Sequence, residues 1–264
     1  MGQSRAVAPA ANTTLLSDAR RAYNEQRYED ASRLAEQATA IPSLAAAARV
    51  IGARAGLERF RQTGDQTDLD TAREALKAVD VAALSPRDQV EFAIGLGVSL
   101  YLDDRYPFDD RYSAAAEQFD LALGRGDLLD DASRDRLFEW WALSVDHQAQ
   151  LDPASDRRPA YERIVARAER ELARSPGAAS ASYWLAAGAR GVDDLPRAWG
   201  AAVAGWVRAG STGTRGDALR DDLERLIVQV ILPERAGQLA AGGDARATLS
   251  SLLAQWEQIK ERWK

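Results

Sequence analysis

The single histidine of the chain lies beside an aspartate, a pair that could act as a general base. His147 follows Asp146 in the segment SVDHQ, and an imidazole held by a carboxylate can accept a proton from a substrate. Adjacent residues on a helix point about 100° apart, however, so these side chains do not form a preassembled dyad. No nucleophile motif lies near them. We therefore expect a structural or surface role for His147, no catalytic site and no enzymatic activity.

A second candidate for chemistry is a doubled Asp-Asp-Arg-Tyr motif in the segment DDRYPFDDRY, residues 103–112. It contains four aspartates, Asp103, Asp104, Asp109 and Asp110. Their carboxylates could bind Ca²⁺, which takes several oxygen ligands, but the EF-hand spacing and its central glycine are missing. Arg105 and Arg111 could neutralise these acids. A calcium site and a loop that contacts a partner stay open; we favour a solvated insertion and expect no metal or cofactor.

The composition excludes several classes of protein. The net charge is -6, with acids and bases interspersed and no basic stripe, so we expect no nucleic-acid partner. No stretch is long and apolar enough to span a bilayer, so we expect no transmembrane segment. Without cysteine the chain has no disulfide and no thiolate site. Aromatic residues are few (7%) and alanine is abundant, which favours close-packed helices over a β-sandwich.

The first residues indicate a location. Met1 and Gly2 lead into SRAVAPAANTT, which has no apolar segment of a signal peptide. This small, polar stretch resembles the tether behind a lipoprotein cleavage site, and the excess of arginine over lysine suggests a GC-rich bacterial genome. We expect residues 1–11 to be a flexible tail. We predict a periplasmic or cell-envelope location, as the mature form of an exported protein; the alternative is the cytoplasm.

Residues 12–42 predict two short helices joined by a tight turn. The first apolar stripe consists of Leu15, Leu16, Ala19, Ala22 and Tyr23. The second consists of Tyr28, Ala31, Leu34, Ala35 and Ala38. Spacings of three and four residues place each stripe on one face of a helix. Pro42 ends the second helix, and because an isolated pair cannot bury both faces, further pairs must stack on it.

Similar pairs follow along the chain. Ser85 and Pro86 predict a helix start with a serine cap. Pro233 is expected to break or restart a helix, and Gly242 and Gly243 to make a second break. Asp244 is expected to cap a final helix with a charged, solvating end.

The segment 12–42 resembles a tetratricopeptide (TPR) unit, whose period is about 34 residues. The resemblance rests on Ala19, Tyr23, Tyr28, Ala31, Ala35, Ala38 and Pro42, whereas Gln26 stands where the family usually has glycine. Leu96-Gly97, Tyr101, Tyr112, Ala115, Phe119 and Ala122 repeat the pattern, and Trp184 and Gly188 echo it. The resemblance implies an all-α fold, a superhelical solenoid of antiparallel helix pairs. We predict one domain over 12–264 with a C-terminal capping helix; an ordinary helical bundle is the alternative.

In this family the first helices of successive pairs line a concave groove that receives a peptide or helix. The inward positions of the motif fall on Arg20, Tyr23, Asn24, Arg49, Tyr101, Glu139, Asp146 and His147. The resemblance implies a protein-interaction scaffold whose partner is another protein or peptide, of mixed charge or apolar. The lysine–asparagine clamp of chaperone-binding TPR domains is absent, because Leu16 and Arg20 stand at its positions.

Two other functions stay open. One is a structural or assembly subunit that forms homo-oligomers or joins an envelope or transport complex, similar in architecture to the T component of TRAP transporters. The other, less favoured, is an all-α enzyme, which would need clustered carboxylates, histidines or cysteines.

Overall fold

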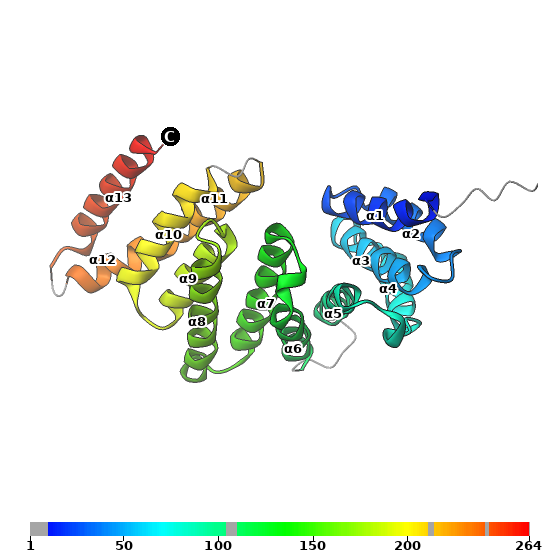
Figure 1. Ribbon diagram of the computed structural model, residues 1–264. Coiled ribbons are helices and arrows are strands. Elements are labelled where there is room, and N and C mark those ends of the chain that lie inside the picture. The colour runs from blue at the N-terminus through cyan, green and yellow to red at the C-terminus, as the bar shows by residue number, and fades with distance from the viewer. Residues whose placement is uncertain (1–9, 104–109, 211–213, 241–242, 264) are drawn as a thin grey trace, which may run out of the picture. The chain divides into compact units, whose positions relative to one another are not determined.

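The computed structural model describes residues 10–103, 110–210, 214–240 and 243–263 (Figure 1). Throughout these described residues the regular structure is helical and no strand occurs. The predicted all-α fold is therefore confirmed. The superhelical arrangement of the helix pairs stays a prediction.

The chain divides into two compact units, Met1–Trp141 and Ala142–Lys264. The prediction of one domain over 12–264 stays a prediction. The first helix begins at Ala10, slightly before the predicted boundary, and residues 1–9 lie outside the described residues.

The first unit is built from helices that pack on their neighbours in the chain. They are α1 (Ala10–Asn24), α2 (Tyr28–Thr39), α3 (Ala45–Thr63), α4 (Gln66–Lys77), α5 (Pro86–Tyr101), α6 (Arg111–Gly124) and the start of α7 (Asp131–Leu151), with the short turns η1 (Val81–Ala83) and η2 (Gly126–Leu128). Besides the consecutive pairs, α1 packs on α3, and α3 packs on α5. The first helices of the pairs therefore lie side by side in one layer, which we call the first-helix layer.

Local sequence explains where several of these helices begin and end. Ser85 and Asp88 form a reciprocal capping box at the start of α5, with Pro86 in the first turn, as the sequence predicts. Gly64 ends α3 in the left-handed conformation at φ 72°, and Asp65 then caps α4. The turn between α1 and α2 also needs a left-handed residue, and there Gln26 adopts φ 61°.

The predicted stripes of α1 and α2 form the core of the first hairpin. Ala22, Tyr23, Tyr28 and Ala31 pack in one buried cluster with Ala55 of α3. A second cluster joins Ala19, Ala35 and Ile51. Because most residues of these two clusters are alanines, the helix backbones approach closely and leave little room for larger side chains.

The second unit contains the end of α7 and the remaining helices. They are α8 (Arg158–Arg174), α9 (Ala179–Gly191), α10 (Leu195–Ala209), α11 (Thr214–Leu226), α12 (Leu232–Ala240) and α13 (Ala245–Arg262), with the 3₁₀ turn η3 (Ala154–Asp156) and the π turn η4 (Ile227–Ile231). Its core includes the fully buried Trp256 of α13. The ring of Trp256 lies 5.2 Å from that of Trp206 and 6.0 Å from that of Trp199, both on α10.

Pro233 changes the helix type instead of breaking the helix. The chain runs from α11 through the π turn Ile227–Ile231 directly into α12, where Pro233 is the second residue. Proline lacks an N–H donor and crowds the carbonyl one turn earlier, and a wider π turn accommodates both. The predicted cap of the last helix is confirmed, since Asp244 accepts hydrogen bonds from the backbone N–H groups of Arg246 and Ala247.

Candidate interaction surface

The predicted groove residues fall in both units. Those of the first unit are Arg20, Tyr23 and Asn24 on α1, Arg49 on α3, Tyr101 on α5 and Glu139 on α7. Asp146 and His147 lie on the part of α7 that belongs to the second unit. Arg49 and Tyr101 are partly buried, and Glu139 is exposed.

Arg20 links α1 to two buried carboxylates of α5. Its Nη2 contacts Asp88, and its Nε lies 3.1 Å from both carboxylate oxygens of Glu91. The side chains of Asp88 and Glu91 are only 11% and 5% exposed. Arg87, one turn before Glu91, adds a longer contact of 3.4 Å to the same carboxylate. Arg20 therefore pairs with two acids that are held out of water, an arrangement that fixes these three side chains, while Arg87 stays half-exposed.

Tyr23 and Arg54 stack beside this ion-pair cluster. The guanidinium carbon of Arg54 lies 4.3 Å from the centre of the Tyr23 ring, a cation–π distance. The Tyr23 hydroxyl donates to Glu58 at 3.4 Å, and Glu58 also pairs with Arg61 at 2.7 Å. Burial raises the pKa of Tyr23, so its phenol stays neutral and able to donate at physiological pH.

A small cavity of about 10 Å³ opens among these groups. It is lined by Arg20, Tyr23, Asn24, Ile51, Arg54, Arg87, Glu91, Leu129 and Ser133. This volume is close to the space that one water molecule needs. Residues from α1, α3 and α5 therefore converge on one point, together with the chain that enters α7.

Arginine and aromatic side chains join the start of α7 to the first-helix layer. Arg136 donates to the side-chain oxygen of Asn24 at 3.3 Å. Farther along α7, the ring of Trp140 lies 4.7 Å from the guanidinium carbon of Arg61 and 5.1 Å from the ring of Tyr101. Arginine, tyrosine and tryptophan are the residues most enriched at protein-binding hot spots.

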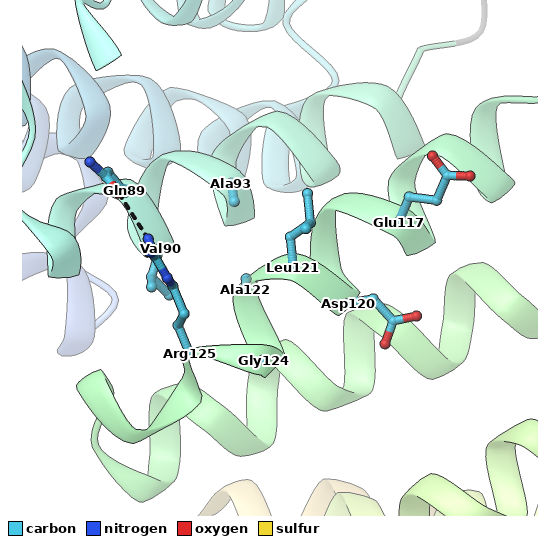
Figure 2. Close-up of a pocket in the computed structure, with 9 residues that line it drawn as sticks. All are labelled: Gln89, Val90, Ala93, Glu117, Asp120, Leu121, Ala122, Gly124 and Arg125. Atoms are coloured by element: carbon cyan, nitrogen blue, oxygen red, sulfur yellow. Dashed lines mark hydrogen bonds between the residues drawn. The ribbon is translucent and has the colours of Figure 1, made fainter. Parts of the chain in front are cut away.

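Figure 2 shows a larger cavity on the pair α5–α6, with a volume of about 840 Å³. Its lining residues are Gln89, Val90, Ala93, Glu117, Asp120, Leu121, Ala122, Gly124 and Arg125. Leu121 is 65% exposed there. Figure 2 places Glu117 and Asp120 toward one end and Arg125, which donates to Gln89 at 2.8 Å, toward the other. None of the predicted groove residues lines this cavity.

In the second unit, Asp146 connects α7 to α8. Its two oxygens accept hydrogen bonds from the Tyr161 hydroxyl at 3.1 Å and from the Gln150 amide at 2.6 Å. Burial, together with the charge of Asp146, raises the pKa of Tyr161. His147, the next residue, is partly buried. Asp146 therefore serves a contact between helices within this unit.

The doubled Asp-Asp-Arg-Tyr segment is described only at its ends. The carboxylate of Asp103 pairs with Arg73 at 2.6 Å, and Arg111 donates to the backbone carbonyl of Asp103 at 2.7 Å. Asp110 is exposed just before α6. The predicted residues Asp104 and Asp109 lie outside the described residues. Within the described part of the chain, no group of three or more His, Cys, Asp or Glu side chains is arranged to hold a metal.

Sequence reasoning missed several residues of this surface: Arg54, Arg87, Asp88 and Glu91. One signal could have revealed Arg54, because it follows Val50 and Ile51 at the three- and four-residue spacing of the buried stripe of α3. A charged residue within such a stripe must find a partner or reach solvent. The partners of Arg20 gave no such signal, since they lie 68 and 71 positions away in the sequence.

Comparisons with known proteins find no relative. No protein-family model matches the chain, and neither a curated protein nor a solved structure matches it. Across the described residues, no helix combines the length and apolar character needed to cross a bilayer.

Proposed function

We propose that the protein is a non-catalytic scaffold that binds a peptide or helix of another protein on its first-helix layer. The convergence of Arg20, Tyr23 and Asn24 with Arg54 and Arg87 around one small cavity carries this proposal. The first three of these residues are also positions at which the TPR resemblance predicts a groove.

The energetics of binding support this choice of surface. Ion pairs and stacking hold Arg20, Tyr23 and Arg54 in place, so a partner would not have to freeze these side chains on binding. Side-chain ordering costs about 0.5–1.5 kcal/mol for each flexible residue at an interface. A layer that is ordered in advance can bind tightly with few contacts.

Three residues of the described helices and turns favour a TPR-like solenoid as the finer fold. Gln26 adopts a left-handed conformation at the position where the family usually has glycine. A Cβ atom at Gly97 of α5 would press on Phe119 of α6, the helix that follows. A Cβ atom at Gly188 of α9 would press on Val165 of α8, the helix that precedes it. For the location, the support is the small, polar stretch before α1, which resembles a lipoprotein tether; we propose the bacterial cell envelope, with the cytoplasm as the alternative.

Capture of the partner tests the proposal. Biotinylated wild-type protein and two charge reversals would be incubated with a bacterial cell-envelope extract. Arg87→Glu changes the first-helix layer, while Arg33→Glu changes an exposed residue of α2 and is the control. We expect one protein to be captured by the wild type and the control but lost with Arg87→Glu. A protein that all three retain would show that the first-helix layer is not the binding surface.

A second candidate function, self-assembly, is favoured by the cavity on α5–α6. It carries an exposed leucine, Leu121, with acids toward one end and Arg125 toward the other (Figure 2). Two copies related by a two-fold axis could place the acidic end of each against the basic end of the other. We expect a mass that rises with protein concentration in light scattering and stays monomeric in Leu121→Glu. Leu239→Glu, at another exposed leucine, is the control.

A further inference from the structure

Arg54 is a partly buried cation without a dedicated acid. Its Nε is buried and has no hydrogen-bond partner within the described part of the chain. No described carboxylate forms an ion pair with its guanidinium. The Tyr23 ring covers one face of this group. An unpaired buried donor on a charged group is costly, so its presence calls for an explanation.

The neighbouring acids are already engaged by other arginines. Glu91 accepts from Arg20 and contacts Arg87, and Glu58 pairs with Arg61. The cavity beside Arg54 is lined by three arginines and one glutamate, and because Arg20 also contacts Asp88, the net charge of these five groups is +1. A negative group from outside the chain would therefore be attracted to this point.

The volume of the cavity limits which anionic groups can enter it. Its volume of about 10 Å³ admits one oxygen-sized group. A flat carboxylate can insert one oxygen toward the Arg54 Nε and leave the other at the mouth, where the half-exposed Arg87 is free to turn toward it. A phosphate group, with its tetrahedral set of oxygens, needs more room.

We propose that this pocket binds the side-chain carboxylate of an aspartate or glutamate in the partner peptide, with the Arg54 Nε–H as the donor within it. The inference rests on the proposed function, because it presumes that a peptide occupies the first-helix layer. It adds the chemistry of one anchor residue in that peptide. Arg54 acts as the specificity residue.

Selection from a random library tests this inference without knowing the natural partner. A phage library of random dodecapeptides would be selected on the full-length wild type and on Arg54→Met. Methionine preserves the aliphatic stem, which packs close to Gly95. We expect wild-type peptides to share an aspartate or glutamate at one position, and Arg54→Met to lose this preference.

A double-mutant cycle on one selected peptide then isolates the contact. Replacing its shared glutamate by glutamine should weaken binding to the wild type about tenfold, or about 1.4 kcal/mol. The same replacement should leave binding to Arg54→Met nearly unchanged, because the interaction is already lost. Equal losses with both proteins would overturn the inference.

Two other results separate this inference from the function on which it rests. Selected peptides that bind the wild type on the first-helix layer but share no acid would overturn the anchor and leave the scaffold standing. A library that yields no binder would count against both. If Arg54→Met does not fold, the Arg54 Nε–H resonance of the wild type serves instead, and it must shift on titration with the glutamate peptide and not with the glutamine peptide.

Discussion

Gly97 of α5 faces Phe119 of α6 so closely that a Cβ atom at position 97 would lie 2.5 Å from a ring carbon of the phenylalanine. Phe119 is fully buried, so its ring has no space into which it can move. We expect Gly97→Ala to lower the free energy of unfolding by about 1–3 kcal/mol, the usual cost of overpacking a core. Urea denaturation would measure this loss.

Gly124→Ala is the matched control for that substitution. Gly124 ends α6, and a Cβ atom there would meet nothing within 4 Å. We expect its free energy of unfolding to stay within about 0.5 kcal/mol of the wild type. If Gly97→Ala behaved in the same way, α5 and α6 would not pack as closely as described.

In the turn between α1 and α2, a substitution should stabilise the protein instead of destabilising it. Gln26 has φ 61°, a conformation that costs a residue with a Cβ atom about 1 kcal/mol or more. We expect Gln26→Gly to raise the melting temperature. Gln37→Gly, in the exposed part of α2, should lower it, because glycine within a helix costs about 1 kcal/mol. A lower melting temperature in both variants would contradict the left-handed turn.

Removal of Arg20 should destabilise the first unit. In Arg20→Met, Asp88 and Glu91 would remain largely buried without their main cation. Breaking a buried ion pair in this way typically costs about 3–5 kcal/mol. Arg33→Met, which removes an exposed pair with Asp30, should cost less than about 1 kcal/mol. Chemical denaturation followed by circular dichroism would compare the two, and equal losses would argue against the buried cluster.

A charged side chain at the contact between α1 and α2 should strongly destabilise the first unit. Ala31 is fully buried in a cluster with Ala22 and Tyr28. We expect Ala31→Arg to unfold this hairpin, since an unpaired buried charge costs several kcal/mol. Gln37→Arg places the same side chain on an exposed position of α2 and should leave the melting curve in place. An unchanged curve for Ala31→Arg would mean that this stripe does not pack on its neighbours.

The stability of the first unit should fall at alkaline pH. Burial, followed by the charge of Glu58, raises the pKa of Tyr28 from 10.0 to about 12. Between these two pH values the folded state therefore keeps the Tyr28 proton while the unfolded state loses it. The contribution of protonated Tyr28 to the free energy of unfolding is complete below pH 10 and is lost as the pH rises toward 12. Equilibrium unfolding at several pH values would show the decline, and Tyr28→Phe should make it shallower. An equally steep decline in that variant would exclude Tyr28 as its source.

The sequence predicts the local features of this fold well. Apolar spacing predicts the stripes of α1 and α2, and the residues Ser85 and Asp244 mark helix starts, because both signals act within one turn of helix. Gln26 is a subtler case. Its departure from the family pattern is visible in the sequence, but its left-handed conformation becomes evident only in the structure.

Features that depend on distant residues could not be predicted. Arg20 was predicted as a groove residue, but its ion pairs with Asp88 and Glu91 were not, because these acids are brought near only when α1, α3 and α5 are assembled. The importance of Arg54 depends on the same assembly. The π turn before Pro233 escaped prediction because proline restricts the helix without dictating how the chain adapts.

The link between Arg20 and the two acids of α5 also bears on how the chain reaches its folded state. Most of the packing in this unit joins helices that are adjacent in sequence, a pattern typical of fast folding. The link from Arg20 to Asp88 spans 68 residues and needs α1, α3 and α5 assembled before it can close. A fluorophore pair placed across this link would therefore report completion of the unit, while the hairpins within it could form earlier and independently.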